Sequence, residues 1–162
     1  MNISEIKDIL ASVTDPEIPV ITIYDLGILR NVEIEESTQK VVVYITPTYT
    51  GCPAMDMITV QIKAALQDHG YNNVEVISLL EPTWTTDWIS ELGRQQLMEY
   101  GISPPAEKTT DPSFLKGEAP SVQCPQCKSF DTEMISRFGS TACKSLYKCK
   151  SCLEPFDYFK CH

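Results

Sequence analysis

Four of the seven cysteines stand in two C-x-x-C pairs whose spacing is typical of a metal site. The first pair is Cys124 and Cys127, and the second, Cys149 and Cys152, follows after twenty-one residues. Two such turns can bring four thiolates to one tetrahedral centre, with zinc–sulfur distances of about 2.3 Å. A site closed by four cysteines has no open coordination position, so we expect a structural zinc ion rather than a catalytic one. The same four-sulfur geometry also suits iron.

The segment that carries these cysteines, residues 122–162, is too short to fold on a hydrophobic core alone. Metal binding would supply the missing folding free energy. The residues between the two pairs, which include EMISRF and SLYKC, favour short strands that return the second pair to the first. These patterns predict a zinc ribbon, although Lys128 and Leu153 stand where a glycine often follows the second cysteine of such a turn.

Three further donors lie in the same segment: Cys143, Cys161 and His162. The simpler interpretation is that the two thiols are buried and that the C-terminal residue is solvated. The alternative is a second, transient metal or cluster site at the end of the chain, FKCH. Basic residues of this segment are expected to offset thiolate charge rather than to bind nucleic acid.

The remaining cysteine, Cys52, lies between a glycine and a proline in TPTYTGCPAMD, residues 46–56. Pro53 fits the first position of a helix, where its missing N–H needs no partner. Cys52 is then expected at or beside the N-cap, near the positive end of the helix dipole, which predicts a lowered thiol pKa. Gly51 permits a tight turn and the close approach of another molecule.

Three acidic residues could reach the same end of the sheet: Asp15 and Glu17 in DPE, and Asp25 in YDLG. They would then lie near Cys52. The alternative is that Cys52 is a small buried residue and that Asp15 and Asp25 cap turns, since nearby carboxylates would raise the thiol pKa again.

The composition excludes several kinds of active site. The only histidines are His69, at the end of an expected helix, and His162, so a Cys–His hydrolase is not supported. Neither a phosphate-binding loop nor a dinucleotide fingerprint is present.

Hydrophobic periodicity predicts the α+β class, with helices packed on one face of a small sheet. The last helix is expected to bury Ile89, Leu92, Leu97 and Tyr100. We expect Trp84 and Trp88 to be core aromatics, the alternative being an exposed docking surface. The expected elements are a helix over 2–13, strands over 28–36 and 40–46, a helix over 53–69, a strand over 72–80 and a helix over 87–100.

The expected domain organisation has three parts. An α+β domain covers residues 1–102, a proline-rich linker covers 103–121, and the zinc ribbon covers 122–162. Residues 1–100 hold five basic and fifteen acidic side chains, net −10, whereas the ribbon has a net charge of +2. A body this acidic repels phosphate backbones, so nucleic acid is not an expected partner.

No apolar run is long enough to span a membrane, and the first residues, MNISEIKDIL, do not resemble a secretory signal. The cytosol is therefore the expected location. There, paired cysteines are better explained by metal than by disulfides.

Residues 1–105 resemble the small domain of iron–sulfur-cluster assembly and targeting factors. The matching segments are VTDPEIPVITIYDLGIL, TPTYTGCPAMDMI and LLEPTWTTDWISELGR. With MEYGISPP and the ending FGSTACKSLYKCKSCLEPFDYFKCH, the whole chain resembles the D-type subunits of phenylacetyl-CoA epoxidase systems, which act in bacterial phenylacetate degradation.

This resemblance implies an accessory protein rather than an enzyme. In such systems other subunits carry the di-iron oxygenase and a flavin and iron–sulfur reductase, and these components are the implied partners. The resemblance implies that the D-type subunit assists insertion of iron or a cluster, with Cys52 as the functional residue and the acidic loop residues beside it. The rival hypothesis is a scaffold subunit that handles no metal. Cargo, client and oligomeric state stay open, and a homo-oligomer is one of the states considered.

Overall fold

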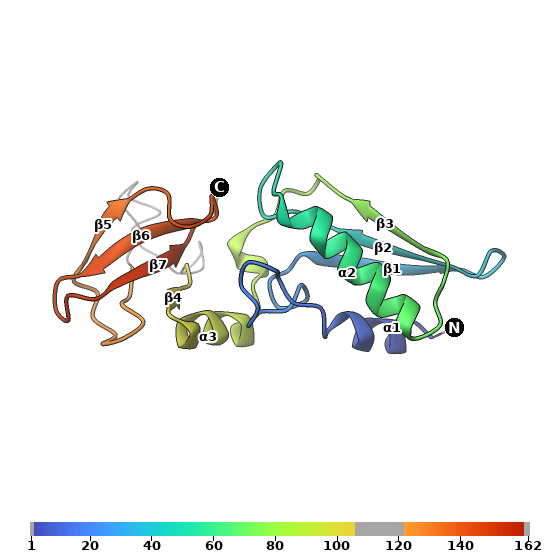
Figure 1. The fold of residues 1–162 in the computed structure, drawn as a ribbon, viewed down its shortest axis with the longest axis horizontal. Coiled ribbons are helices and arrows are strands. Elements are labelled where there is room, and N and C mark those ends of the chain that lie inside the picture. The colour runs from blue at the N-terminus through green and yellow to red at the C-terminus, as the bar shows by residue number, and fades with distance from the viewer. Residues whose placement is uncertain (1, 106–121, 161–162) are drawn as a thin grey trace. The chain divides into compact units, whose positions relative to one another are not determined.

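A computed structural model describes residues 2–105 and 122–160 of the chain (Figure 1). The chain divides into two compact units, Met1–Trp84 and Thr85–His162. Through residue 100 the order is helix, strand, strand, helix, strand, helix, with one added 3₁₀ turn before the last helix. The predicted α+β class is confirmed. No helix in the described residues has the length and apolar character needed to cross a membrane.

The N-terminal unit is a three-stranded sheet with helices on one face. The strand order is β1-β2-β3, with β1 and β2 antiparallel, as predicted, and β2 and β3 parallel. A parallel pair requires a crossover connection, which α2 provides as it crosses one face of the sheet (Figure 1). The elements are α1 (Ile3–Leu10), β1 (Leu29–Glu35), β2 (Lys40–Ile45), α2 (Ala54–Asp68) and β3 (Val74–Ser78).

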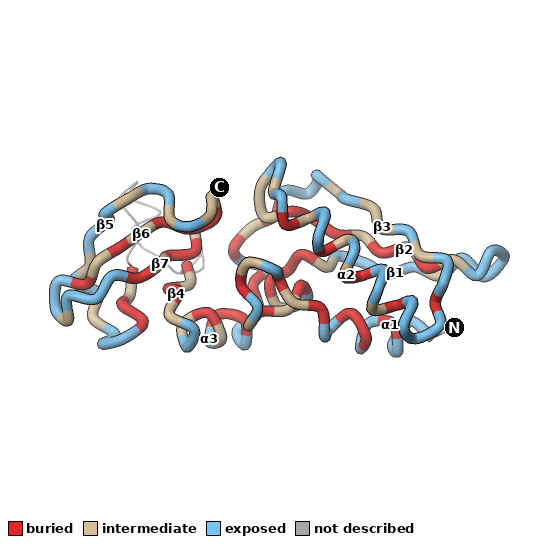
Figure 2. The backbone as a smooth tube through the Cα atoms, viewed as in Figure 1, coloured by how far each residue is buried: buried red, intermediate tan, exposed pale blue. Residues whose placement is uncertain are grey.

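Strand β2 is buried on one face only, as its alternating sequence predicts. Val41, Val43 and Ile45 are at most 1% exposed, whereas Val42 and Tyr44 are half-buried (Figure 2). Helix α2 presents a matching stripe, because apolar residues four positions apart lie on one side of a helix. Its fully buried residues are Ile58, Ile62 and Leu66.

The loop between α1 and β1, residues 11–28, forms a large part of this core. The sequence predicts an ordered loop, and the structure confirms it: Thr14 and Thr22 form an isolated β-bridge, and the Ile23 N–H donates to the Val13 carbonyl at 2.9 Å. Periodicity did not predict its packing role, because its apolar residues are separated by turns. Those at most 1% exposed are Ile18, Ile21, Ile23, Leu26 and Ile28.

Trp84 anchors this loop from the end of the N-terminal unit. Its side chain is 3% exposed, and its Nε1–H donates to the Leu26 carbonyl at 2.9 Å. The prediction of a core tryptophan is confirmed for Trp84, while Trp88 is half-buried.

The C-terminal unit is a four-stranded sheet preceded by one short helix. The strand order is β4-β7-β6-β5, in which β5, β6 and β7 pair antiparallel and β4 pairs parallel to β7. The elements are η1 (Thr86–Trp88), α3 (Glu91–Tyr100), β4 (Ile102–Ser103), β5 (Thr132–Ser136), β6 (Lys144–Cys149) and β7 (Pro155–Phe159). One core cluster contains Val122, Cys124, Tyr147, Cys149, Phe156 and Tyr158.

Helix α3 differs from the expected helix in its start and in its buried face. It begins at Glu91 rather than at residue 87, because Ser90 is its N-cap and accepts the Gly93 N–H at 2.9 Å. Leu92 and Tyr100 were expected to be buried but are 55% and 52% exposed. Only Ile89 and Leu97 of the expected set are buried, so the helix packs through a narrower stripe.

The division between the units also falls earlier than the expected boundary at residue 102. It lies after Trp84, so α3 belongs to the C-terminal unit. Ser103, expected to open the linker, pairs with Tyr158 in the sheet. Most of the expected linker, residues 106–121, lies outside the described residues.

Replacing Trp84 with Phe should destabilise the N-terminal unit, because the Leu26 carbonyl would lose its indole donor in a buried site. We expect a loss of about 1–3 kcal/mol in the free energy of unfolding. Urea titration followed by far-ultraviolet circular dichroism measures it. The control Tyr24→Phe changes a side chain that is 60% exposed and should cost less than about 0.5 kcal/mol. Equal losses in the two variants would refute the role given to this hydrogen bond.

Candidate functional site

The C-terminal unit brings together the four cysteines predicted to bind metal. Their Sγ atoms all lie within 4.8 Å of one another, with Cys124 and Cys152 at 3.7 Å and Cys127 and Cys149 at 3.5 Å. A zinc tetrahedron with bonds of about 2.3 Å has sulfur–sulfur edges of about 3.8 Å. The four side chains therefore fit a four-coordinate metal.

Two turns of the same form present these sulfurs. The Cys124 N–H donates to the Ser129 carbonyl at 2.8 Å, and the Cys149 N–H donates to the Glu154 carbonyl at 3.0 Å. After the second cysteine of each turn the backbone is left-handed, with φ of 64° at Lys128 and 67° at Leu153. This conformation explains why glycine often occupies the position. Lys128 and Leu153 adopt it without being glycine.

The thiols of this cluster do not all ionise easily without a cation. The backbone N–H of Cys152 is the main cause that lowers the pKa of Cys149, to about 6. The backbone N–H of Glu154 is the largest single influence on the pKa of Cys152 and lowers it, but burial and the interactions with the neighbouring cysteines together raise the pKa to about 12. A divalent cation would favour the thiolate form of all four cysteines, since thiolates are the ligands that it binds.

Of the three remaining donors of this unit, Cys143 lies in the described part of the chain and is not a member of the cluster. Cys143 is buried, and its Sγ lies 3.0 Å from the Thr141 Oγ1. This position fits the simpler interpretation of a buried thiol. Cys161 and His162 lie outside the described residues.

In the N-terminal unit, Cys52 lies in the turn between β2 and α2. Helix α2 begins at Ala54 with Pro53 as its N-cap, one position later than predicted. Gly51 has φ of 80°, and a Cβ there would meet no atom within 4 Å, so glycine is required by the turn rather than by crowding. The Cys52 N–H donates to the Tyr49 carbonyl at 3.3 Å, and the side chain is half-buried.

The predicted lowering of the Cys52 pKa is wrong. Burial is the main cause that raises the pKa of the thiol, and the negative charges of Glu17 and Asp15 raise it further. A backbone N–H of Ala54 and the Tyr49 side chain lower it, each by less than burial raises it, although each has a larger effect than either carboxylate. The start of α2 therefore lowers the thiol pKa as predicted, but the causes that raise the pKa outweigh this effect. Tyr49 was missed by sequence reasoning, although its place in the same turn could have suggested it.

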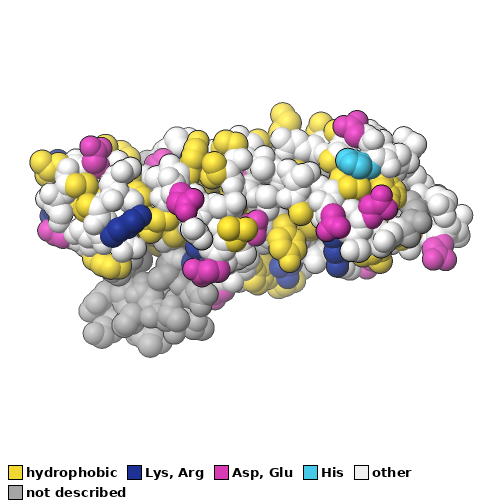
Figure 3. Space-filling model, turned by 90° about the horizontal axis from the view of Figure 1, so that it is seen from below, with side chains coloured by type: hydrophobic (Ala, Val, Ile, Leu, Met, Phe, Trp, Pro, Cys, Tyr) yellow, Lys and Arg dark blue, Asp and Glu magenta, His cyan; other side chains and the backbone are white. Residues whose placement is uncertain are grey.

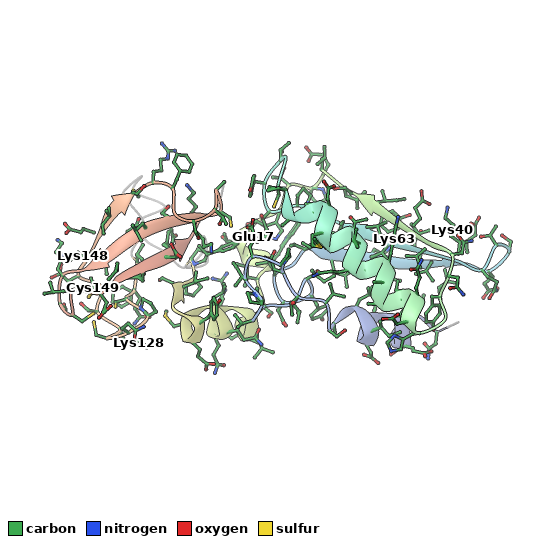
Figure 4. The ribbon with its side chains drawn as sticks, in the orientation of Figure 1. Glu17, Lys40, Lys63, Lys128, Lys148 and Cys149 are labelled. Atoms are coloured by element: carbon green, nitrogen blue, oxygen red, sulfur yellow. The ribbon has the colours of Figure 1, made fainter. Side chains whose placement is uncertain are left out.

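Two of the three predicted acidic residues act on Cys52. Figure 4 shows Glu17 at the end of the unit where α2 begins, and Glu17 is half-buried. Asp15 is 7% exposed, and its Oδ1 accepts the N–H groups of Glu17 at 2.8 Å and Ile18 at 2.9 Å. Asp15 thus fixes the turn that presents Glu17. Asp25 accepts the Thr22 hydroxyl at 2.8 Å and so supports the adjoining turn.

The comparisons with known proteins agree with a chain made of two different parts. The family model described as "Iron-sulfur cluster assembly protein" matches residues 3–78. The model described as "PaaD zinc beta ribbon domain" matches residues 108–160. A protein of Escherichia coli (strain K12), named as the D component of a 1,2-phenylacetyl-CoA epoxidase, is 48% identical over 159 residues, which are 98% of this chain and 93% of that protein. The chain belongs to the PaaD family.

Solved structures support the PaaD-family fold of the N-terminal part. A domain of unknown function, DUF59, from Bacillus anthracis has a TM-score of 0.54 and 27% identity, covering 59% of this chain and 90% of that one. A conserved hypothetical protein from Thermotoga maritima has a TM-score of 0.51 and 28% identity, covering 60% of this chain and 94% of that one. The PaaD-type chain is thus a DUF59-like domain followed by a four-cysteine ribbon.

Removing one sulfur should release the metal from the ribbon. We expect Cys149→Ser to reduce bound metal from about one ion per chain to near zero, with loss of ribbon structure, because coordination supplies its folding free energy. Elemental analysis by mass spectrometry measures the metal and distinguishes zinc from iron. Cys143→Ser is the matched control, because Cys143 is a buried cysteine of the same unit outside the cluster. Equal retention of metal by both variants would contradict the assignment.

The raised pKa of Cys52 predicts slow alkylation at neutral pH. Labelling by iodoacetamide, followed by mass spectrometry of the peptide that contains Cys52, should accelerate only as the pH rises above the ordinary range of a thiol. Glu17→Gln removes one negative charge, so the labelling curve should move to lower pH. Glu36→Gln, an equivalent change at an exposed turn residue, should leave the curve unchanged. If Glu17→Gln has no effect, Glu17 does not act on the thiol.

Proposed function

We propose that this chain is a non-enzymatic accessory subunit that assists the insertion of iron or an iron–sulfur cluster into a metalloprotein. Its clients would be the oxygenase or the reductase of a phenylacetyl-CoA epoxidase system, since the curated relative is named as a component of that epoxidase. The match of residues 3–78 to an iron–sulfur cluster assembly family supports the direction of this proposal.

One observation carries the proposal: Cys52 is a half-buried thiol in the turn before α2, and the negative charges of Glu17 and Asp15 act on it. Their negative charges disfavour the thiolate form of Cys52. A nucleophilic cysteine needs that form, so these surroundings do not suit a nucleophile. The same charges attract a cation, and a bound cation in turn favours the thiolate. A protonated thiol that ionises as it meets a metal ion is suited to transient ligation. Glu17 would contribute a carboxylate ligand, and Asp15 would hold Glu17 in place.

The surroundings of Cys52 argue against covalent catalysis. Both histidines of the chain are remote in sequence, and His69 lies at the far end of α2 with its Nδ1 2.8 Å from the Ala65 carbonyl. No histidine is found among the described residues that act on Cys52, so the usual base partner of a nucleophilic thiol is missing there. Iron or a cluster would therefore be cargo, and no turnover is assigned to the chain.

We assign the ribbon a structural zinc ion held by its four cysteines. With four protein ligands the ion would have no open position for chemistry, and its contribution would be to fold the C-terminal unit. We propose domains that follow the family matches, with the assembly-factor part within residues 3–78 and the ribbon part within 108–160.

Metal loading of the clients tests the proposal. The oxygenase and the reductase are purified from cells that make the wild-type chain, Cys52→Ser, Glu36→Gln or no chain, and their iron and acid-labile sulfide are measured. We expect Cys52→Ser to lower the metal content of one client several-fold, as deletion does. Glu36→Gln should match the wild type, because this residue is exposed and lies in the turn between β1 and β2.

The same experiment identifies the client and the cargo. Loss of iron and sulfide from the reductase would indicate a cluster, and loss of iron from the oxygenase would indicate iron itself. If both clients stay fully loaded while epoxidase activity is lost only on deletion, the chain is a scaffold and the proposal fails.

A further inference from the structure

The face of the N-terminal sheet opposite the helices carries a groove of about 430 Å³. Its floor is apolar and comes from the central and last strands: Val42 and Tyr44 on β2 and Ile77 on β3. Tyr44 pairs with Ile77 across the sheet, and all three side chains are half-buried rather than covered. No described segment of the unit packs over these residues.

Three carboxylates form the rim of this groove: Glu33 and Glu35 on β1 and Glu75 on β3. The Tyr44 hydroxyl donates to Glu33 at 3.0 Å, and the Lys40 ammonium pairs with Glu75 at 2.5 Å. The Lys40 ammonium is thus engaged by Glu75, with Glu35 also acting on it. The whole N-terminal unit is acidic as well, with four basic and twelve acidic residues in 1–84, net −8, and Figure 3 shows acidic side chains spread over another of its faces.

A surface of the opposite kind lies on the ribbon, where β5 ends and turns toward β6. We call Arg137, Phe138 and Lys160 the basic corner. Phe138 is 60% exposed, Arg137 is exposed, and the Lys160 ammonium lies 4.0 Å from the centre of the Phe138 ring. Burial is the main cause that lowers the pKa of Lys160, and the nearby positive charge of Arg137 lowers it further.

The backbone of the basic corner is fixed. The Arg137 carbonyl accepts both the Ser145 hydroxyl, at 3.0 Å, and the Lys160 ammonium. The next residue, Gly139, is tightly packed, because a Cβ at this position would lie 2.8 Å from an Asp157 carboxylate oxygen. An exposed aromatic ring on an ordered backbone loses little entropy on binding, which is a property of residues that anchor interfaces.

From these two surfaces we infer that the basic corner of one chain docks into the acidic groove of a second copy, with Phe138 on the apolar floor and Arg137 at the carboxylate rim. Each copy carries both surfaces, and the assembly that we infer is a two-fold dimer held by two reciprocal contacts rather than an open head-to-tail chain. The second copy is the favoured occupant because it supplies the required charge and aromatic side chain in the same protein at equal concentration. The inference is independent of any metal at Cys52.

Charge exchange between the two surfaces tests the inference on the full-length chain. Sedimentation velocity should show a dimer of the wild type at concentrations up to about 100 µM, weakened by salt between about 0.05 and 0.5 M. Arg137→Glu and Glu33→Arg should each raise the dissociation constant by about tenfold or more, because like charges would meet in the interface. The double variant, with both charges exchanged, should recover the wild-type dissociation constant.

Two further variants separate docking from misfolding. Phe138→Ala should also weaken the dimer by about tenfold, since it removes the anchor from a largely exposed position. Lys63→Glu, an equivalent charge reversal on the exposed side of α2 (Figure 4), should leave the dimer unchanged.

Several outcomes would overturn the inference. These are a wild type that stays monomeric, a dimer indifferent to the single reversals, or single effects that the double variant does not repair. A monomer whose sedimentation coefficient changes with the reversals would place the contact within one chain. If Lys63→Glu also weakens the dimer, the effect of the charge reversals comes from the net charge of the chain and not from the proposed contact.

Discussion

The position of Cys52 depends on the parallel pairing of β2 and β3. Because parallel neighbours cannot be joined by a tight hairpin, the chain must leave the carboxyl end of β2, pass through α2 and return. The turn at the start of that crossover carries Cys52, half-buried beside the loop that presents Glu17. The same crossover covers one face of the sheet with α2 and leaves the other for the groove. One topological requirement therefore sets both the thiol and the open face.

The electrostatics of the Cys52 turn separate two kinds of chemistry that a lone cysteine could serve. A nucleophilic thiol needs surroundings that lower its pKa, and here burial, Glu17 and Asp15 raise it. A bound cation would lower the thiol pKa instead, because the carboxylates attract the cation and the cation stabilises the thiolate. The helix start contributes in the expected direction through the Ala54 N–H, but one backbone donor does not outweigh desolvation and two charges.

The ribbon illustrates how coordination can tolerate unfavourable local conformation. Lys128 and Leu153 are left-handed, a conformation that costs a non-glycine residue about 1 kcal/mol or more. The two turns nevertheless place four sulfurs in one cluster, and a metal–thiolate site can supply far more than this cost. Absence of glycine after the second cysteine is thus compatible with the ribbon geometry. The Leu153 side chain remains 65% exposed at one of these turns.

The sequence by itself determined the local elements and the four-cysteine spacing, because period, turn residues and ligand spacing are local properties. The alternation in β2, the stripe in α2 and the pairs Cys124–Cys127 and Cys149–Cys152 all have the structure they predict. Only the tertiary structure decided the sign of the Cys52 pKa shift, since burial and the approach of Glu17 are long-range. It also decided that Leu92 is exposed and that Leu26 is core, because burial depends on which element arrives opposite a residue, and periodicity does not specify that.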